Sequence, residues 1–464
     1  MFEKLANIFR IPDLRKRVLF TLALLAIYRL GGHIPTPGIN ADLLQQFFEQ
    51  NRGTFLGYAD LFSGGQLRRL TVFALGIMPY ITASIILQLL TVVYEPLARL
   101  QKEGELGRRK ITQWTRYLTV VLGAMQSFGI AITLQRSTTT GGLQFVIDPG
   151  VGFILMTVLT LTTGTAFIMW LGEQITERGI GNGMSLLIFA GIVVGLPHAI
   201  LDLGEKVRTA SWGAFTFPAV LMLLVLMLVV VAFIVFVERS ERRIPVQYAK
   251  RVIGRKVMGG QSTHLPLRVN AGGVMPVIFA SSILTFPQTA GFFLKDNKFF
   301  APLLEQLHWG EPLYNLLYAA GIIFFAYFYV SIVFNPNEVA DNMRKYGGFV
   351  PGIRPGKRTA DHINEILTRL TLVGGLYLIV ISILPEWMIA GIKLNHLPGA
   401  LGAFFEQLPT WVTNGLGVNF YFGGTSLLIV VGVAMDTLQQ IESQLVMRNY
   451  EGFMKRGRIR GRRG

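Results

Sequence analysis

Cysteine is absent from this chain of 464 residues, so neither disulfides nor thiol ligands contribute to its fold or chemistry. Charge is also scarce: Asp, Glu, Lys and Arg make up 15% of the residues, against about 25% in an ordinary soluble domain. Acidic side chains are nearly missing from the interiors of the long apolar runs. Carriers driven by protons or sodium usually need carboxylates or histidines at depth in the membrane. The scarcity of such groups argues against an ion-coupled carrier.

Motifs for nucleotide binding and catalysis are missing as well. The run from Gly352 to Lys357 has too few residues between its glycines, and no Ser or Thr after the lysine, to bind phosphate as a P-loop. The glycines of 179–183 follow an apolar helical segment rather than a strand, which excludes a dinucleotide-binding loop. The six histidines show no metal-ligand spacing. Since no nucleophile lies in a recognisable pattern with a base, we expect no enzyme activity, no cofactor and no metal site.

Long apolar runs are what the chain has in abundance. Hydrophobic residues make up 51% of it, and the mean hydropathy is +0.47. A helix needs about 20 apolar residues to cross a bilayer. By this criterion we predict ten membrane-spanning helices, at 18–36, 71–93, 117–135, 151–171, 184–203, 215–237, 272–294, 312–334, 367–391 and 418–436. The basic run Arg15–Arg17 precedes the first span, but no small-residue cleavage site follows, so we expect a retained helix and not a cleaved signal peptide.

The positive charge is distributed unevenly between the loops. The net charge is +16, and most of the 43 Lys and Arg residues fall in every second loop, in the set that also holds both termini. Basic loops stay in the cytoplasm. The sequence therefore predicts a multi-pass membrane protein with both termini in the cytoplasm.

Two of these basic loops, 238–270 and 335–366, have features that membrane topology alone does not explain. Attraction to anionic membrane lipids is the plain explanation for a basic loop, at about 1 kcal/mol per cation. The second loop, however, holds its cations in the run from Pro351 to Arg358, where proline and glycine fix a rigid turn. A lipid patch would not need that stiffness, so we expect protein or ribonucleoprotein partners here.

Ten spans divide into two sets of five with opposite membrane orientation, as in inverted-repeat transporters. The expected domains are an N-terminal half at 1–203, a hinge loop at 204–214, a C-terminal half at 215–447 and a basic tail at 448–464. Pro79 and Pro276 lie at corresponding places in the second span of each half. We expect these two helices to line a pore or gate, although ordinary proline kinks would give the same pattern.

A short polar element with glycines, Phe62-Ser63-Gly64-Gly65, comes directly before the first proline-broken span. Non-helical backbone at membrane depth is tolerated only where protein buries it or water fills a cavity. This favours a pore. The mildly polar side chains within the spans either bond helices together or mark a seam that opens, and they gather in the second, third and seventh spans. They are Thr82, Ser84, Gln88, Gln126, Ser127, Ser281, Ser282, Thr285 and Gln288.

Several long segments, in order along nearly the whole chain, resemble the SecY family of channel-forming subunits of the bacterial protein-export translocon. The segments that carry the resemblance are Phe62–Gly65, Ala74–Leu90, Lys102–Ile111, Trp170–Gly183, Gln261–Leu267, Phe349–Gly356 and Phe420–Ile429. The resemblance implies an all-α integral membrane protein whose two inverted five-helix halves enclose a central hourglass pore. It also implies a plug helix at about 59–69, which includes Phe62, Ser63, Gly64 and Gly65.

The resemblance further implies a ring of aliphatic side chains at the constriction, a lateral gate between the two halves, and a docking surface on the basic loops. The ring maps to Ile77, Ile81, Met184, Ile188, Ile278 and Ile429. The lateral gate maps to Thr82, Ser84, Gln88, Gln126, Ser127, Ser281, Ser282 and Thr285. The docking surface maps to Arg251, Arg255, Lys256, Arg354 and Lys357.

The partners implied by the resemblance are the SecE and SecG subunits, the SecA ATPase motor, the ribosome, and signal sequences with their preproteins. The resemblance also implies that the chain lies in the bacterial cytoplasmic (inner) membrane. The expected function is passage of unfolded preproteins across this membrane and lateral release of transmembrane segments into it. The connection at 392–417 is longer than in compact family members. The main alternative is a secondary transporter of a small solute built on inverted repeats; the plug segment and the stiff basic loops argue against it.

Overall fold

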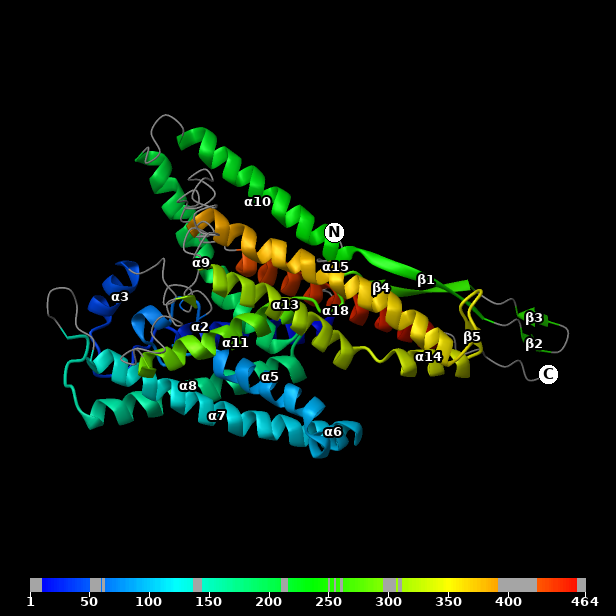
Figure 1. Cartoon of the computed structure of the whole chain (residues 1–464), viewed down its shortest axis with the longest axis horizontal. Coiled ribbons are helices and arrows are strands. Elements are labelled where there is room, and N and C mark those ends of the chain that lie inside the picture. Colours follow the sequence, from blue (N-terminus) through cyan, green and yellow to red (C-terminus); the bar gives the residue numbers. More distant parts are fainter. Residues whose placement is uncertain are drawn as a thin grey trace, which may run out of the picture. The chain divides into compact units, whose positions relative to one another are not determined.

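The structure is a computed structural model of the chain, shown in Figure 1. It describes residues 11–50, 60, 63–136, 144–209, 216–248, 251–253, 256–258, 262–294, 306–307, 311–390 and 424–456. Several predicted features fall wholly or partly outside these residues. They include Phe62 of the plug, Arg255 of the docking surface, part of the hinge loop 204–214, the connection 392–417, the start of the span 418–436 and the end of the basic tail.

Long helices dominate the described chain, and each predicted span overlaps one of them (Figure 1). The helices that overlap the spans are α2 (Pro12–Gly31), α5 (Met78–Val93), α7 (Glu105–Arg136), α8 (Val151–Arg178), α9 (Gly183–Arg208), α10 (Thr216–Arg239), α11 (Met275–Leu294), α13 (Pro312–Val333), α15 (Lys357–Ala390) and α18 (Gly424–Arg456). The predicted all-α membrane fold is confirmed.

Within the described residues, four helical stretches are both long and apolar enough to cross a membrane. They are Glu105–Gln135, Val151–Arg178, Pro312–Lys345 and Lys357–Leu384. A fifth candidate is the pair formed by α5 and α6 (Glu95–Lys102), bent by 103° at the break between them. Many large apolar side chains on the helices are exposed, such as Leu228 and Phe236 on α10. Such surfaces suit lipid contact, because a soluble protein rarely exposes large apolar patches.

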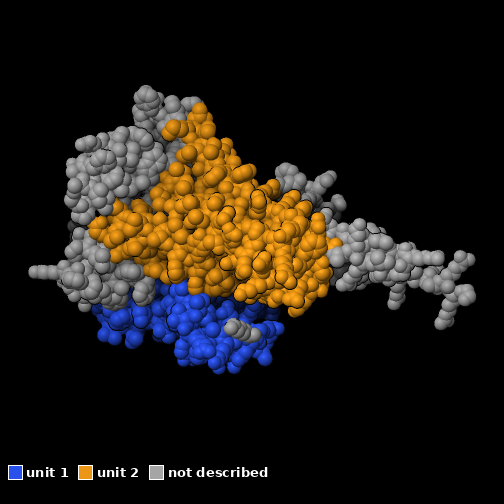
Figure 2. All heavy atoms as spheres, turned by 45° about the vertical axis from the view of Figure 1, so that its right-hand side comes forward, with its two compact units in different colours: residues 1–198, 433–464 blue, residues 199–432 orange. Residues whose placement is uncertain are grey.

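The chain forms two compact units, coloured separately in Figure 2. Unit 1 holds residues 1–198 and 433–464, and unit 2 holds residues 199–432. In unit 1, α7 packs against α8 and α5, and a buried cluster around Leu44, Leu70 and Leu161 joins α3 (Ala41–Gln50) to α8. In unit 2, α13 packs between α11 and α15.

Both predicted basic loops of unit 2 are folded, and they share one β-sheet. β1 (Glu241–Tyr248) lies between β4 (Ser262–Arg268) and β5 (Gly348–Phe349), and both neighbours are antiparallel to it. Between α13 and β5 runs the short helix α14 (Pro336–Lys345). Buried side chains from the sheet, from the residue after β5 and from α13, α14 and α15 form one hydrophobic cluster. Its members are Ile244, Val246, Leu267, Val330, Met343, Val350, Ile363 and Leu367.

These strands were not predicted, because residues 238–270 and 335–366 were interpreted only as loops. A signal was present, since Ile244 and Val246 alternate with exposed neighbours, which is the period of a half-buried strand. A second hairpin, β2 (Arg251–Ile253) with β3 (Lys256–Met258), extends the first loop. Several helices also run further than predicted, and two of them enter segments that were expected to be a loop and a tail. α9 continues to Arg208, into the expected hinge loop, and α18 continues to Arg456, into the expected tail.

Candidate functional site: plug segment and constriction residues

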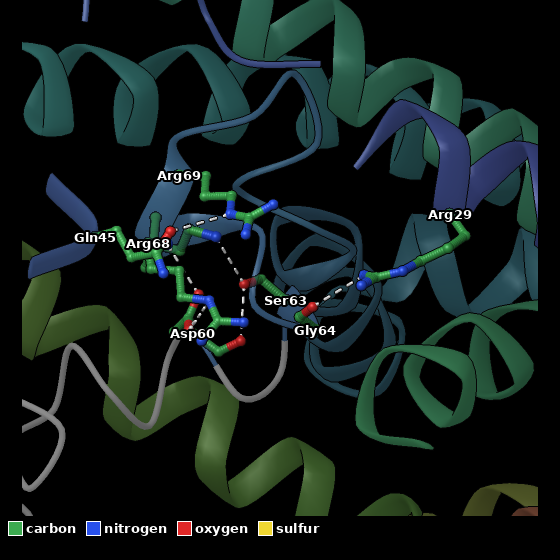
Figure 3. A network of polar contacts seen from close by, with 8 residues as sticks. Arg29, Gln45, Asp60, Ser63, Gly64, Arg68 and Arg69 are labelled. Atoms are coloured by element: carbon green, nitrogen blue, oxygen red, sulfur yellow. Dashed lines mark hydrogen bonds and ion pairs between the residues drawn. The ribbon is translucent and has the colours of Figure 1, made fainter. Parts of the chain in front are cut away.

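The predicted plug at 59–69 is described at residues 60 and 63–69, which we call the plug segment. The segment is held in shape by its own hydrogen bonds (Figure 3). The Ser63 hydroxyl donates to the Asp60 carbonyl at 3.0 Å and accepts from the Leu67 N–H at 3.1 Å. The Gly65 N–H donates to the same Asp60 carbonyl at 2.8 Å. The Asp60 carboxylate accepts from the Arg68 N–H at 2.9 Å. These bonds satisfy a turn of non-helical backbone locally, so the segment keeps its shape without a neighbouring helix or strand.

Asp60 is the buried acidic group of this segment. Burial raises the pKa of its carboxyl, while the backbone N–H and the guanidinium of Arg68 act in the opposite direction. The Arg68 Nε lies 3.9 Å from Asp60 Oδ2. Both charged groups therefore lie within the plug segment itself, and they partly neutralise one another there.

Gly64 brings the plug segment against the backbone of α9. Its φ is +71°, and a Cβ added to it would lie 2.8 Å from the Gly191 Cα and 3.0 Å from the Gly191 carbonyl oxygen. A Cβ added at Gly76 would lie 3.7 Å from the Ser63 Cα. The plug segment thus rests on two glycines of unit 1, one in α9 and one shortly before α5. No side chain could be inserted at Gly64 without displacing backbone.

The two glycines that seat the plug adjoin predicted ring positions. Ile188 lies one helical turn before Gly191 on α9, and residues at this spacing share a face. Ile77 directly follows Gly76 and is the residue preceding α5. Ile77 and Ile188 are buried. Within unit 1, therefore, the plug segment contacts one glycine that precedes Ile77 in the chain and another on the face of α9 that carries Ile188.

Close helix contacts at glycine also lie near ring positions in each unit. In unit 1, a Cβ at Gly172 of α8 would lie 2.4 Å from the sulfur of Met184, which is half-buried in the first turn of α9. In unit 2, a Cβ at Gly432 of α18 would lie 2.3 Å from a methyl of Val274, directly before α11. That contact holds the start of α11, with Ile278, against the helix that carries Ile429.

Ile81, Ile278 and Ile429 are all buried. The six ring positions share one property: each lies at, or within six residues of, the first residue of its helix. Helices that begin within a membrane span place their ends at depth, where channels and transporters build their sites. Whether the six meet in one ring stays a prediction.

An internal repeat links the two proline-bearing helices more closely than the matched prolines alone. Residues 76–84 read GIMPYITAS, and residues 273–281 read GVMPVIFAS. The two glycines have nearly equal φ values, +56° at Gly76 and +58° at Gly273. Ile81 and Ile278 occupy the same place in the repeat. The matched prolines and glycines therefore start two helices in the same way, one in each unit.

The predicted lateral-gate side chains mostly bond within their own helices. The Thr82 hydroxyl donates to the Met78 carbonyl at 3.0 Å, and the Ser127 hydroxyl donates to the Gly123 carbonyl at 2.6 Å. Ser281 and Ser282 both donate to the Ile278 carbonyl. Gln88 bonds Ser84 at 3.3 Å, Gln126 is half-buried, and the side chain of Thr285 lies outside the described residues. Hydroxyls bonded in this way can stay within a membrane span without a partner helix.

The predicted docking residue Arg354 lies exposed on a turn fixed by glycine. Gly352 and Gly356 have φ values of +82° and +102°. The Arg354 carbonyl accepts from the Thr359 hydroxyl at 3.0 Å, which ties the turn to the first residues of α15. Lys357, also exposed, is the first residue of that helix. The expected rigid presentation of these cations agrees with this geometry. Arg251 and Lys256 lie on β2 and β3, and their side chains are not among the described ones.

The comparisons with known proteins agree on one family. The family model named SecY matches residues 71–438. This chain belongs to the SecY family. The protein translocase subunit SecY of Escherichia coli (strain K12) is 50% identical over 452 residues, covering 97% of this chain and 96% of that protein. The SecY subunit of Vibrio cholerae is 48% identical over 457 residues, again covering 97% of this chain and 96% of that protein.

Solved structures of SecY-related channels share the fold. A structure described as a protein-conducting channel matches with a TM-score of 0.60 at 16% identity, covering 93% of this chain and 92% of that chain. A Sec61 structure from a canine ribosome–channel complex matches with a TM-score of 0.58 at 15% identity, with the same coverage. The family resemblance stated from the sequence is thus confirmed.

Proposed function

We propose that this SecY-family chain is the central subunit of a protein-conducting channel. It passes unfolded preproteins across the cytoplasmic membrane and releases transmembrane segments sideways into the lipid. The observation that carries the proposal is the seat of the plug segment: Gly64 rests on Gly191, one helical turn beyond Ile188. A removable segment packed beside an aliphatic constriction is what a gated pore for polymers needs, and a small-solute carrier does not need it.

The aliphatic ring seals the pore without binding what passes. Isoleucine and methionine side chains offer no hydrogen bonds to a substrate, and a narrow apolar constriction excludes water and ions when closed. Methionine at position 184 is flexible and fills irregular gaps, so it suits a ring that must widen and close again. A polar ring would either hold the substrate or leak ions.

The plug can leave its seat with little disruption to itself. Its bonds between Asp60, Ser63 and Arg68 stay within the segment. Its contacts with Gly191 and Gly76 involve no interlocking side chain, and the bonds from Arg29 to Gly64 and from Arg69 to Gln45 must break. The plug therefore moves as a preformed turn. It exposes the constriction without having to unfold.

Lateral release is governed by transfer free energy. A segment in the channel that meets lipid through the gate stays in the membrane if it is apolar enough. A charged residue at its centre costs about 2.5–3.5 kcal/mol. The intrahelical bonds of Thr82, Ser127 and Ser281 suit a gate that separates, because these hydroxyls keep a partner when the two sides part.

The two basic loops serve as one docking body for the machinery that supplies work. They share the sheet β4-β1-β5 and one buried cluster, so Arg354 is held on a folded base. We assign this surface to the SecA motor and the ribosome, with SecE and SecG as further subunits and anionic lipids around the basic rim. Membership of the SecY family favours the inner membrane of a bacterium. The distribution of Lys and Arg favours an orientation with both termini in the cytoplasm. The channel itself catalyses no reaction in this scheme.

Ion conductance in planar bilayers tests the proposed constriction. The double substitution Ile81→Ser with Ile278→Ser places hydroxyls at the matched positions of the repeat, and we expect the resting channel to leak ions. The control is Ile85→Ser, one turn further along α5, where the side chain is also buried but outside the ring. Unchanged conductance in the double variant, or an equal rise in the control, contradicts the assignment of the ring.

A further inference from the structure

Arg29 is a cation within the first predicted membrane span. It lies in the last turn of α2 and is half-buried. Cations in membrane spans are rare and are retained where they pair with another group or with backbone carbonyls. The negative end of the helix dipole at the end of α2 favours a cation in this turn, but many positions in that turn would satisfy the dipole. The sequence alone gives Arg29 no role beyond this.

The structure gives Arg29 a specific partner in the plug segment. Its Nη1 donates to the Gly64 carbonyl at 3.2 Å, across 35 positions of sequence (Figure 3). Gly64 is also the residue that rests on Gly191 of α9. One plug residue is thus held from two sides, by a guanidinium of α2 and by the backbone of α9.

The end of α2 touches the plug segment a second time. Gly32, three positions after Arg29, lies against Gln66: a Cβ added there would meet the Gln66 side-chain amide carbon at 2.9 Å. Gln66 itself is almost completely buried. Residues three apart lie on one face of a helix, so the end of α2 presents the guanidinium and a flat glycine surface to adjacent parts of the plug.

We propose that Arg29 is a positioning residue that latches the plug in its closed place. The inference rests on the proposed channel function. It adds that the Arg29 guanidinium favours the seated plug over the displaced plug in the resting channel. Hydrogen bonds from a charged donor are stronger than those between neutral groups. Displacing the plug breaks the bond between Arg29 and Gly64. Opening is therefore opposed by a charged contact that a substrate or docking partner must overcome.

The absence of cysteine makes a direct test possible. A single Ser63→Cys substitution gives the full chain one thiol, in a residue that is 4% exposed when the plug is seated. The rate at which a small soluble maleimide labels this thiol, in the chain reconstituted into lipid nanodiscs, reports how often the plug leaves its seat. Every variant compared carries this reporter, and the parent is the Ser63→Cys chain itself, because the substitution replaces the hydroxyl that bonds Asp60 and Leu67.

We expect Arg29→Gln to raise the labelling rate at least about tenfold, which corresponds to about 1.4 kcal/mol. Arg29→Lys keeps the positive charge but loses the several N–H donors of the guanidinium. Its labelling rate should therefore lie between that of the parent and that of Arg29→Gln. The matched control is Arg369→Gln, which removes the other cation within a predicted span; Arg369 is exposed and pairs with Glu365 on its own helix. Should Arg29→Gln fail to yield folded protein, Arg29→Lys carries the test.

A labelling rate for Arg29→Gln equal to that of the parent overturns the latch. So does an equal rise with Arg369→Gln, because that would show a general effect of removing charge. Planar-bilayer conductance of the double variant Ile81→Ser with Ile278→Ser separates the latch from the channel. Faster labelling of Arg29→Gln, together with unchanged conductance of that double variant, upholds the latch and contradicts the proposed channel. Unchanged labelling, in a chain that still conducts when Ile81 and Ile278 are serine, leaves the channel and removes the latch.

Discussion

The seat of the plug segment can be challenged with one methyl group, by Gly64→Ala. The φ of +71° at Gly64 costs an alanine about 1–2 kcal/mol. The new Cβ would also lie 2.8 Å from the Gly191 Cα, which is closer than real Cβ contacts come, and the obstacle is backbone. Overpacking of this kind costs about 1–3 kcal/mol. The closed plug should therefore lose about 2–5 kcal/mol of stability, the sum of the two costs.

The neighbouring glycine supplies the matched control. Gly65 has a φ of +78°, nearly that of Gly64, but the atoms nearest to its added Cβ belong to the flexible end of the Arg68 side chain, at 3.1–3.4 Å. Gly65→Ala therefore suffers the same backbone cost without a clash against α9. The difference between the two variants isolates the contact with Gly191, at about 1–3 kcal/mol, or about 5–150-fold in the population of displaced plug.

The assay is maleimide labelling of the Ser63→Cys reporter in each glycine variant, with thermal unfolding measured in parallel. We expect Gly64→Ala to label much faster than Gly65→Ala, while the midpoint of unfolding of the whole chain changes little in either. Equal labelling of the two variants would refute the reasoning, because it would mean that the plug does not rest on α9.

Two further predictions concern charge. Arg354→Glu should abolish most motor- or ribosome-driven translocation while the chain stays folded. The control is Arg208→Glu, which reverses a charge on the opposite predicted side of the membrane and should leave translocation unchanged. Normal translocation by Arg354→Glu would refute the docking role. For Asp60, a raised pKa in the folded plug means that the seated plug binds a proton more tightly than the displaced one. Lowering the pH through that raised pKa should therefore stabilise the seated plug and slow labelling of the reporter chain, relative to labelling of the same chain with Asp60→Asn. Identical pH profiles of labelling in these two chains would contradict this prediction.

The helices of this fold could be predicted because a membrane span is identified by the length of its apolar run. Each of the ten predicted segments overlaps a helix, since an apolar run of about 20 residues has few other stable forms in lipid. Boundaries were less accurate where polar residues continue a helix beyond the membrane, as in α9 to Arg208 and α18 to Arg456. The sheet β4-β1-β5 was missed because two of its strands lie in one basic loop and the third comes from another. Its pairing depends on a contact between segments far apart in the sequence.

The site could be predicted only in part, for a different reason. Family resemblance led to Ile77, Ile188 and the plug segment by their side chains. The seat, however, is made by Gly191 and Gly76, whose role is to have no side chain, and the latch is a bond from Arg29 to a backbone carbonyl. Neither contact can be recognised from a single sequence. An arginine within a membrane span is, however, itself a reason to search for a partner. The repeat of residues 76–84 at 273–281 is different, because the residues themselves pair position 81 with position 278.

Crosslinking from the constriction tests the central claim most directly. A photoreactive residue replaces Ile81 in the full chain, reconstituted in vesicles, and a stalled secretory chain is supplied with SecA and ATP. The account predicts an adduct between position 81 and the stalled chain, and none from the same probe at Ile85. If SecA is bound and the secretory chain is engaged but no adduct forms at position 81, the polypeptide does not pass the proposed constriction and the channel assignment is contradicted.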